Sequence, residues 1–352
     1  MTLEAVLHQR IAAGGPISIA DYMAECLMHP EFGYYTTSRP FGRSGDFITA
    51  PEISQMFGEV VGLALAQAWM DQGAPSRFTL AELGPGRGTL MADLLRATRP
   101  VPGFHAAMDL VLVEASEQLR NEQRAALDGY DLRFLTDTAA LPDQPLFGVA
   151  NEFFDALPIR QFQRSGTGWR ERQVGLNDGV LTFGLGPQSP QPALALRLED
   201  TKDGDIVEYA PSLAPLAAPL GARIEEHGGA FLIVDYGDWR SLGDTLQAVR
   251  THKRANPLEK PGDADLTAQV DFEAIATATP CAHTRLTPQG VFLERLGITA
   301  RAQALAKGLQ GDALNQHIAA HRRLTHPDEM GNLFKTIGLF PKGKTPPPGL
   351  DI

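Results

Sequence analysis

Cysteine is scarce in this sequence: its 352 residues include only Cys26 and Cys281. Two such distant cysteines have neither the spacing of metal ligands nor the number that a disulfide framework needs. The histidines His227 and His252 are also isolated, and nothing pairs them at ligand spacing. We therefore expect no metal site. We also expect the protein to work in a reducing compartment.

Long apolar runs are missing as well. The longest stretches, such as Val60–Trp69, are interrupted and too short to cross a bilayer. Residues 1–10 are amphipathic and carry an early acid, unlike a secretory signal, and they lack the Arg- and Ser-rich pattern of a transit peptide. These features predict a cytoplasmic protein without membrane insertion.

Basic residues are fewer than acidic ones. The chain carries 31 Lys and Arg against 42 Asp and Glu, a formal net charge of -11, so we do not expect a nucleic-acid partner. The hydrophobic fraction of 43% and the charged fraction of 21% are typical of a soluble globular protein. The length suffices for one large domain or two ordinary ones.

Short aliphatic runs alternate with segments of helical periodicity along the middle of the chain. The runs that predict strands are 78–83, 110–113, 132–135, 146–150 and 230–235, and the segments that predict helices are 90–98, 117–127 and 213–227. This alternation predicts an α/β fold, with helices on both faces of a doubly wound parallel sheet. Residues 284–286, with a short helix at 292–298, are expected to complete it.

Two regions fall outside this rhythm. Residues 1–76 are predicted to form a helical N-terminal cap, ahead of a core at 77–352. Within the core, residues 159–205 alternate like hairpin strands around the turn signal Asn177-Asp-Gly179, which predicts an antiparallel insertion. Residues 299–352 are expected to form a helical and then Pro-rich tail.

A glycine-rich stretch, AELGPGRGTL at 81–90, follows the first predicted strand of the core. Its glycines, Gly84, Gly86 and Gly88, would let the backbone turn sharply and approach a ligand closely, and the amides of the following helix would point at that ligand. A tight turn alone would also explain a glycine cluster. The strand before it and the helix after it favour a ligand-binding loop.

The spacing and the neighbouring acid indicate which ligand binds. Dinucleotide-binding folds use G-x-G-x-x-G, whereas this loop has G-x-G-x-G, with Glu82 two residues before the first glycine. A carboxylate there would repel a pyrophosphate but suit a cationic ammonium or sulfonium, and S-adenosylmethionine (SAM) carries both. An NAD-dependent oxidoreductase remains an alternative, although its longer glycine spacing is absent.

An acid also ends the next predicted strand, where Glu114 follows Val113. A carboxylate at this place can accept hydrogen bonds from both hydroxyls of an adenosine ribose. NAD and SAM enzymes share this arrangement, so Glu114 supports a nucleoside without choosing between them. Capping of the helix that begins after Ser116 would be a purely structural role for the same residue.

Three polar residues, Asn151, Glu152 and Asp155, follow the predicted strand at 146–150. Ligands of open α/β sheets bind outside the carboxyl ends of the strands, so these residues should border the same crevice as the glycine loop. Carboxylates there could hold a guanidinium by bidentate hydrogen bonds and direct its nitrogen at a methyl donor. A helix start capped by Asn151 is the structural alternative.

Several sequence blocks resemble the MidA-like SAM-dependent methyltransferases, once known only as a domain of unknown function. The blocks, in chain order, are His29–Tyr35, Gly45–Glu59, Glu82–Gly88, Asn151–Pro158, Val234–Gly237, Asn256–Gly262 and Asp265–Phe272. They extend over nearly the whole chain. The resemblance implies a class I methyltransferase fold with a helical N-terminal cap and an inserted hairpin region.

The resemblance also implies an activity and a partner. Mitochondrial members of the family are complex I assembly factors that symmetrically dimethylate an arginine of a complex I subunit, so such a subunit is the first candidate substrate. Residues 45–59 would lie over the cofactor, with Asp46, Thr49 and Glu52 near its polar end. Gln269 stands where the family pattern has histidine, which puts a titrating role there in doubt. A non-catalytic assembly factor that keeps a SAM pocket is the second alternative.

Overall fold

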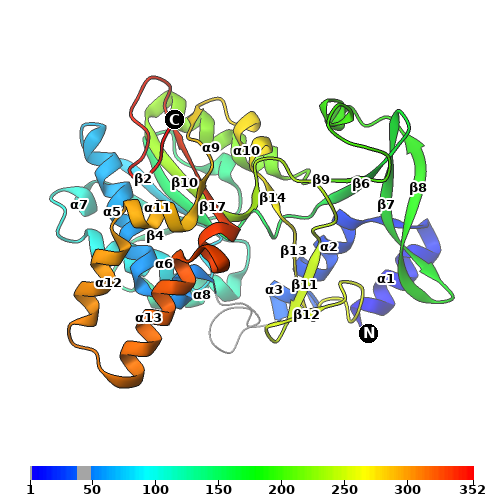
Figure 1. Cartoon of the computed structure of the whole chain (residues 1–352), viewed down its shortest axis with the longest axis horizontal. Coiled ribbons are helices and arrows are strands. Elements are labelled where there is room, and N and C mark those ends of the chain that lie inside the picture. The colour runs from blue at the N-terminus through cyan, green and yellow to red at the C-terminus, as the bar shows by residue number, and fades with distance from the viewer. Residues whose placement is uncertain (1, 38–48) are drawn as a thin grey trace. The chain divides into compact units, whose positions relative to one another are not determined.

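The computed structural model describes residues 2–37 and 49–352, and the chain divides into two compact units. The core unit contains Ile48–Phe154, Leu213–Trp239 and Phe272–Ile352; the N-terminal unit contains Met1–Phe47, Asp155–Ser212 and Arg240–Asp271. The boundary proposed at residue 76 stays a prediction. Each unit is described by itself below, with the labels of Figure 1.

A mostly parallel sheet organises the core unit. Its strands run in the order β15-β17-β10-β5-β2-β3-β4, with β10, β5, β2, β3 and β4 parallel to one another. Their bounds are β2 Phe78–Leu83, β3 Met108–Val113, β4 Leu132–Leu135, β5 Leu146–Asn151 and β10 Gly229–Asp238. All five strands predicted from the aliphatic runs are therefore present, and the predicted α/β fold class is confirmed.

The antiparallel edge of this sheet differs from the expectation. The strand beside β10 is β17, Phe334–Phe340, which runs antiparallel to it. Residues 284–286 lie between two short strands, β15 (Ala282–His283) and β16 (Thr287–Pro288), and both pair with β17. The run FKTIGLF supplies a longer apolar stretch than residues 284–286, and it occupies the place predicted for them.

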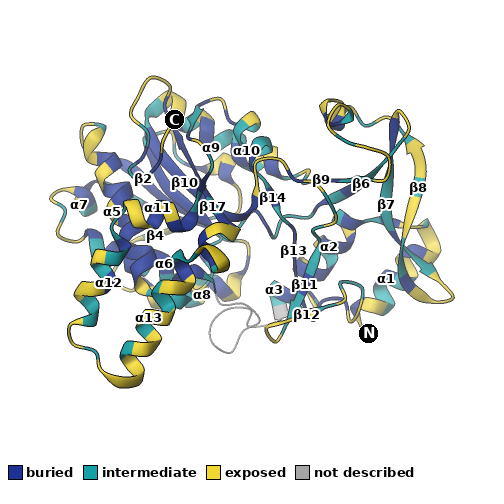
Figure 2. Cartoon of the chain, in the orientation of Figure 1, coloured by how far each residue is buried: buried dark blue, intermediate teal, exposed yellow. Residues whose placement is uncertain are grey.

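Helices cover the core sheet. Those of the core unit are α4 Ala50–Ile53, α5 Gln55–Asp71, α6 Thr89–Thr98, α7 Phe104–Ala107, α8 Glu117–Ala126, α9 Leu213–His227, α10 Phe272–Ala278, α11 Gln289–Arg295, α12 Ile298–Ala306 and α13 Gly311–Thr325. The three predicted helices correspond to α6, α8 and α9, and the region predicted as a helical and then Pro-rich tail contains α12 and α13. Strands of the sheet are mostly buried (Figure 2).

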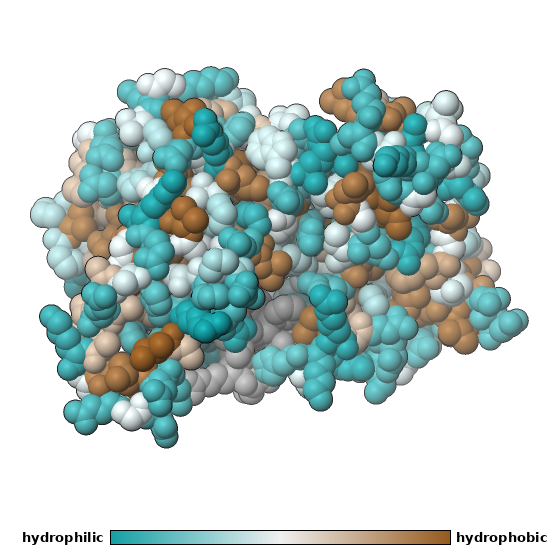
Figure 3. Space-filling view, viewed as in Figure 1, coloured by the Kyte–Doolittle hydropathy of each residue, from teal (hydrophilic) through white to brown (hydrophobic). Residues whose placement is uncertain are grey.

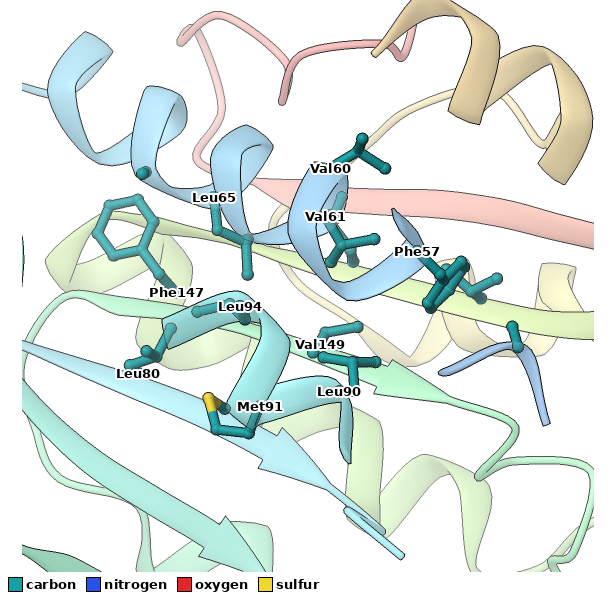
Figure 4. Packing of buried hydrophobic residues seen from close by; sticks show 14 of the residues in the cluster. Phe57, Val60, Val61, Leu65, Leu80, Leu90, Met91, Leu94, Phe147 and Val149 are labelled. Atoms are coloured by element: carbon teal, nitrogen blue, oxygen red, sulfur yellow. The ribbon is translucent and has the colours of Figure 1, made fainter. Parts of the chain in front are cut away.

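One hydrophobic core lies between the sheet and α5 and α6. Figure 4 shows Phe57 and Val61 of α5, Met91 of α6, and Leu80 and Val149 of the sheet in one cluster. Successive residues of a strand point to opposite faces, so the side chains between these positions face away from that cluster. On that side α9 packs against β5, β10 and β17. The doubly wound arrangement follows from this packing.

The N-terminal unit is built on antiparallel strands. Its larger sheet has the order β1-β7-β6-β9, with β8 paired to β7, and a three-stranded sheet has the order β12-β11-β13. The strands are β1 Ile17–Ser18, β6 Arg160–Ser165, β7 Gly168–Asn177, β8 Val180–Ser189, β9 Ile206–Tyr209, β11 Gln247–Arg250, β12 Lys253–Ala255 and β13 Asp265–Thr267; the helices are α1 Leu3–Gly14, α2 Ile19–Met28 and α3 Tyr34–Thr37.

The turn predicted between two of these strands is present. Asp178 and Gly179 join β7 to β8, and both have a positive φ, 49° and 77°. Two consecutive positive φ values are the signature of a type I′ turn, whose twist matches that of the flanking strands. The short sequence signal therefore identified the hairpin correctly.

Candidate functional site

The glycine loop, Gly84–Gly88, connects β2 to α6 in the core unit. All three of its glycines have a positive φ, 60° at Gly84, 53° at Gly86 and 83° at Gly88. A Cβ on Gly84 would lie 2.6 Å from the Cδ2 atom of Phe153. The loop therefore needs glycine for its backbone path and, at Gly84, for its close packing as well.

Glu82 lies in β2 just before the glycine loop and is only 3% exposed. Burial raises the pKa of its carboxyl to about 8, although a hydrogen bond with the backbone of Met91 works in the opposite direction. Its Oε2 atom is buried and has no hydrogen-bond partner among residues 2–37 and 49–352. A buried carboxyl oxygen without a partner is costly, and a cationic or hydrogen-bond-donating ligand would relieve that cost.

Glu114 follows β3, as the sequence predicted, and its carboxylate is linked to the glycine loop. Its Oε1 accepts from the amide of Ser116 at 2.8 Å, and its Oε2 accepts from Nε2 of Gln123 at 3.2 Å. The same Nε2 donates to the carbonyl oxygen of Gly86 at 2.7 Å. Burial raises the pKa of Glu114. Sequence reasoning missed Gln123, because one glutamine on a polar helix gives no signal of its own.

The segment Asn151–Phe154, here called the acceptor segment, begins with the last residue of β5. Glu152 has a φ of 52° although it is not glycine. Its Oε1 accepts from the amide of Ala50 at 2.8 Å and from Nδ2 of Asn151 at 3.1 Å. Burial raises the pKa of Glu152 to about 7, while these hydrogen bonds and the charge of Arg323 oppose the rise. The structure thus brings Asn151 and Glu152 together at the carboxyl end of β5.

Asp235 of β10 holds the acceptor segment from the neighbouring strand. Its Oδ2 accepts from the amides of Phe153 at 3.2 Å and Phe154 at 2.9 Å, and its Oδ1 accepts from the amide of Tyr236 at 2.9 Å. The side chain is fully buried. These contacts with backbone amides are those of a cap.

Asp155 belongs to the N-terminal unit and is 8% exposed. Its carbonyl oxygen accepts from the amide of Ala268 at 2.9 Å. In the same unit the hydroxyl of Tyr35 donates to Asp265 at 2.9 Å, and burial, together with the charges of Asp265 and Asp155, raises the pKa of Tyr35. Gln269 donates its backbone amide to Thr245 at 2.8 Å.

The segment predicted to lie over the cofactor is described in part. Asp46 lies outside the described residues, whereas Thr49 precedes α4 and makes no side-chain cap to it. Glu52 of α4 accepts from the hydroxyl of Thr89, the first residue of α6, at 2.6 Å, and lies 3.8 Å from Arg87 of the glycine loop. Through Glu52, α4 contacts the start of α6.

No helix in the described part of the chain is long and apolar enough to cross a membrane, and Figure 3 shows hydrophobic residues scattered among hydrophilic ones on the face in view. In residues 2–37 and 49–352, no group of three or more His, Cys, Asp and Glu side chains could hold a metal ion.

Comparisons with known proteins identify the family of the chain. A family model described as "Putative S-adenosyl-L-methionine-dependent methyltransferase" matches residues 60–291. The chain is 39% identical to "Protein arginine methyltransferase NDUFAF7, mitochondrial" of Danio rerio, over 95% of this chain and 86% of that protein. Its identity to the Homo sapiens protein of the same name is 34%, over 95% and 82%.

A solved structure is also similar. A protein from Burkholderia thailandensis, bound to S-adenosyl-homocysteine, matches with a TM-score of 0.82 and 29% identity over 99% of this chain and 92% of that one. This match confirms the methyltransferase fold that the resemblance implied, and it does not favour the NAD-dependent alternative.

The relatives correct one expectation and establish the family. They are named as mitochondrial proteins, so the prediction of a cytoplasmic protein is wrong. Scarce cysteine separates disulfide-rich secreted proteins from others, but it does not separate the cytoplasm from the mitochondrion. The family predicted from the motifs is confirmed: the chain belongs to the SAM-dependent methyltransferases that the family model describes.

Proposed function

We propose that this protein transfers methyl groups from SAM to an arginine side chain of a protein substrate. Family membership supports the methyl donor, and the relatives named protein arginine methyltransferases support the acceptor. One structural observation carries the proposal: Glu82 buries a carboxyl oxygen without a partner in the described residues, directly before a loop of three left-handed glycines. When bound, SAM supplies a methyl group on a positively charged sulfur.

The residues of the core unit fit such a cofactor. A cationic amino group would satisfy the buried oxygen of Glu82. Glycine at position 84 lets the loop pack against Phe153, where a Cβ would lie 2.6 Å from the ring. Glu114 would accept hydrogen bonds from ribose hydroxyls. We assign cofactor binding to Glu82, Gly84, Gly86, Gly88, Glu114, Asp46 and Thr49.

The acceptor residues are proposed to be Asn151, Glu152 and Asp155. Carboxylates bind a guanidinium through short, bidentate, charge-assisted hydrogen bonds, which would fix the direction of the attacking nitrogen. Each methyl transfer to a guanidinium nitrogen releases one proton. Glu152, with a pKa of about 7, is suited to accept that proton near neutral pH.

The substrate proposal goes one step further. We infer that the acceptor is a subunit of a respiratory complex I and that the product is symmetrically dimethylated arginine, as the family resemblance implies. A subunit arginine that docks beside Glu152 would be methylated twice, once on each terminal nitrogen.

The test is a transfer assay with labelled SAM and a mitochondrial extract, followed by mass spectrometry of the labelled peptide. We expect label on one arginine, and at least about 100-fold less transfer with Glu152→Gln or Asp155→Asn. Label on another residue type would overturn the arginine assignment. Binding of SAM without transfer to any extract protein would favour a non-catalytic assembly factor instead.

A further inference from the structure

We propose that Gln123 is a positioning residue that orients Glu114 toward the ribose diol of the bound nucleoside and fixes the glycine loop at the same time. This inference rests on the proposed function, since it takes a SAM-type nucleoside as the ligand. Gln123 stands on α8, a helix that none of the sequence motifs includes.

The side-chain nitrogen of Gln123 connects the glycine loop with Glu114. Its Nε2 donates to the carbonyl oxygen of Gly86 at 2.7 Å and to Oε2 of Glu114 at 3.2 Å. An amide nitrogen has two hydrogens, so both are used. The reverse orientation of the amide would place Oε1 against two acceptor oxygens, so this network fixes the orientation.

The second oxygen of Glu114 is fixed separately. Its Oε1 accepts from the amide of Ser116 at 2.8 Å. With one oxygen tied to Ser116 and the other to Gln123, the carboxylate cannot rotate freely. Each carboxylate oxygen can still accept a second hydrogen bond, so the arrangement leaves acceptor capacity for two adjacent hydroxyls.

Packing alone does not explain why the buried residue at position 123 is a polar glutamine. Leu119 and Gln123 are the two buried side chains of α8, and Gln123 is 0% exposed. A leucine at position 123 would fill this place without the cost of burying an amide.

One polar atom of Gln123 is left over. Its Oε1 is buried and has no hydrogen-bond partner in the part of the chain that the structure describes. Burying an unpartnered amide oxygen destabilises the folded protein. A ligand hydroxyl or an ordered water at this place would satisfy it, which is a second, independent indication that Gln123 faces a ligand.

The experiment compares two ligands and three proteins by calorimetry. The ligands are S-adenosyl-homocysteine and its 2′-deoxy counterpart; the proteins are the wild type, Gln123→Leu and, as a matched control, Gln118→Leu. Gln118 lies on the same helix but is exposed. A merely structural role of Gln123 would weaken both ligands equally, so the ratio of the two dissociation constants is the decisive readout.

We expect the wild type to bind the 2′-deoxy ligand about 10-fold or more weakly than the hydroxylated one. Gln123→Leu should bind S-adenosyl-homocysteine about 10- to 100-fold more weakly than the wild type and should discriminate little between the ligands. Gln118→Leu should behave as the wild type. If Gln123→Leu does not fold, Gln123→Asn replaces it in the experiment. Asparagine keeps the polarity but is one methylene shorter, so this variant should show the same weaker binding and the same loss of discrimination.

The outcomes separate this inference from the proposed function. Full discrimination by a folded Gln123→Leu or Gln123→Asn protein would overturn the positioning role, while SAM-dependent transfer by the wild type stands. If the wild type bound neither ligand, the proposed function would fail, and the role of Gln123 with it.

Discussion

The glycine loop and the acceptor segment lie at the same edge of the core sheet, because β2 and β5 are neighbouring parallel strands, but they are held in different ways. The loop follows from local backbone freedom, since its glycines reach positive φ at little cost. In the acceptor segment Glu152 adopts a positive φ against its own preference, at a cost of about 1–3 kcal/mol.

Distant groups offset that cost. Asp235 accepts from the amides of Phe153 and Phe154, and Glu152 accepts from the amide of Ala50. The comparison shows that the glycine loop is shaped by its own sequence, while the acceptor segment depends on residues far away in the chain. The glycine loop should therefore be disturbed mainly by substitutions within it, whereas the acceptor segment should also be disturbed by substitutions of distant residues.

The largest loss of stability is expected at Gly84, where the glycine loop contacts Phe153 of the acceptor segment. Gly84→Ala adds a Cβ 2.6 Å from the ring of Phe153 and forces alanine to a φ of 60°. We expect the free energy of unfolding to fall by about 2–4 kcal/mol and SAM binding to be lost. Urea denaturation and calorimetry measure the two effects.

The matched control is Gly129→Ala. Gly129 has a φ of 87°, but a Cβ there would meet nothing within 4 Å, so only backbone strain of about 1 kcal/mol should appear. Equal losses in the two variants would mean that contact with the acceptor segment contributes nothing.

The second largest effect should come from Asp235→Asn. The substitution keeps the shape but replaces a carboxylate that accepts from three backbone amides. We expect a loss of about 3 kcal/mol in unfolding free energy and a marked fall in methyl transfer, because the acceptor segment loses its fixed position. Asp238→Asn, at the exposed end of the same strand, should stay within about 0.5 kcal/mol of the wild type. A stable and fully active Asp235→Asn protein would contradict the dependence on distant groups.

The same difference explains what the sequence could predict. Gly84, Glu82 and Glu114 stand at fixed offsets from the ends of strands, so a recognised strand was enough to place them. The amide of Ala50 that binds Glu152 lies about a hundred residues earlier in the chain, and no local pattern indicates such a contact.

Helix periodicity has a similar limit. It predicted α8, but not that Gln123 of this helix contacts Gly86 and Glu114. The position of β17 depends on pairing with β10, a non-local contact that apolar runs alone do not specify. Roles of Asn151, Glu152 and Asp155 toward a substrate stay predictions.

The pH dependence of stability tests how burial acts on Glu152 of the acceptor segment. Burial raises its pKa from 4.5 to about 7, so between these values the folded state binds more protons than the unfolded state. This contribution is fully present below about pH 4.5 and is lost as the pH rises through 7, by about 3 kcal/mol in total. Glu152→Gln should remove that part of the pH dependence. Denaturation at pH 5 and pH 8 measures it, and an unchanged difference between the two would exclude a raised pKa at Glu152.

The smallest effect should come from Arg323, near the end of α13. Its charge lowers the pKa of Glu152, and its neighbour Leu324 packs in the same core as Ala50, whose amide binds Glu152. Arg323→Gln removes that charge, so the pKa of Glu152 should rise, and the acidic limb of the methyl-transfer rate should move to higher pH by roughly half a unit.

Arg322→Gln is the matched control for this shift. It removes the same charge one residue away, where Arg322 pairs with Glu329 at 2.8 Å instead. Rate profiles from pH 5 to 9 for the two variants should therefore differ, with a shift in Arg323→Gln alone. An equal shift in both would mean that net charge, rather than the position of Arg323 beside Glu152, sets the pKa. In that case the acceptor segment would be less dependent on individual distant residues than its hydrogen bonds indicate.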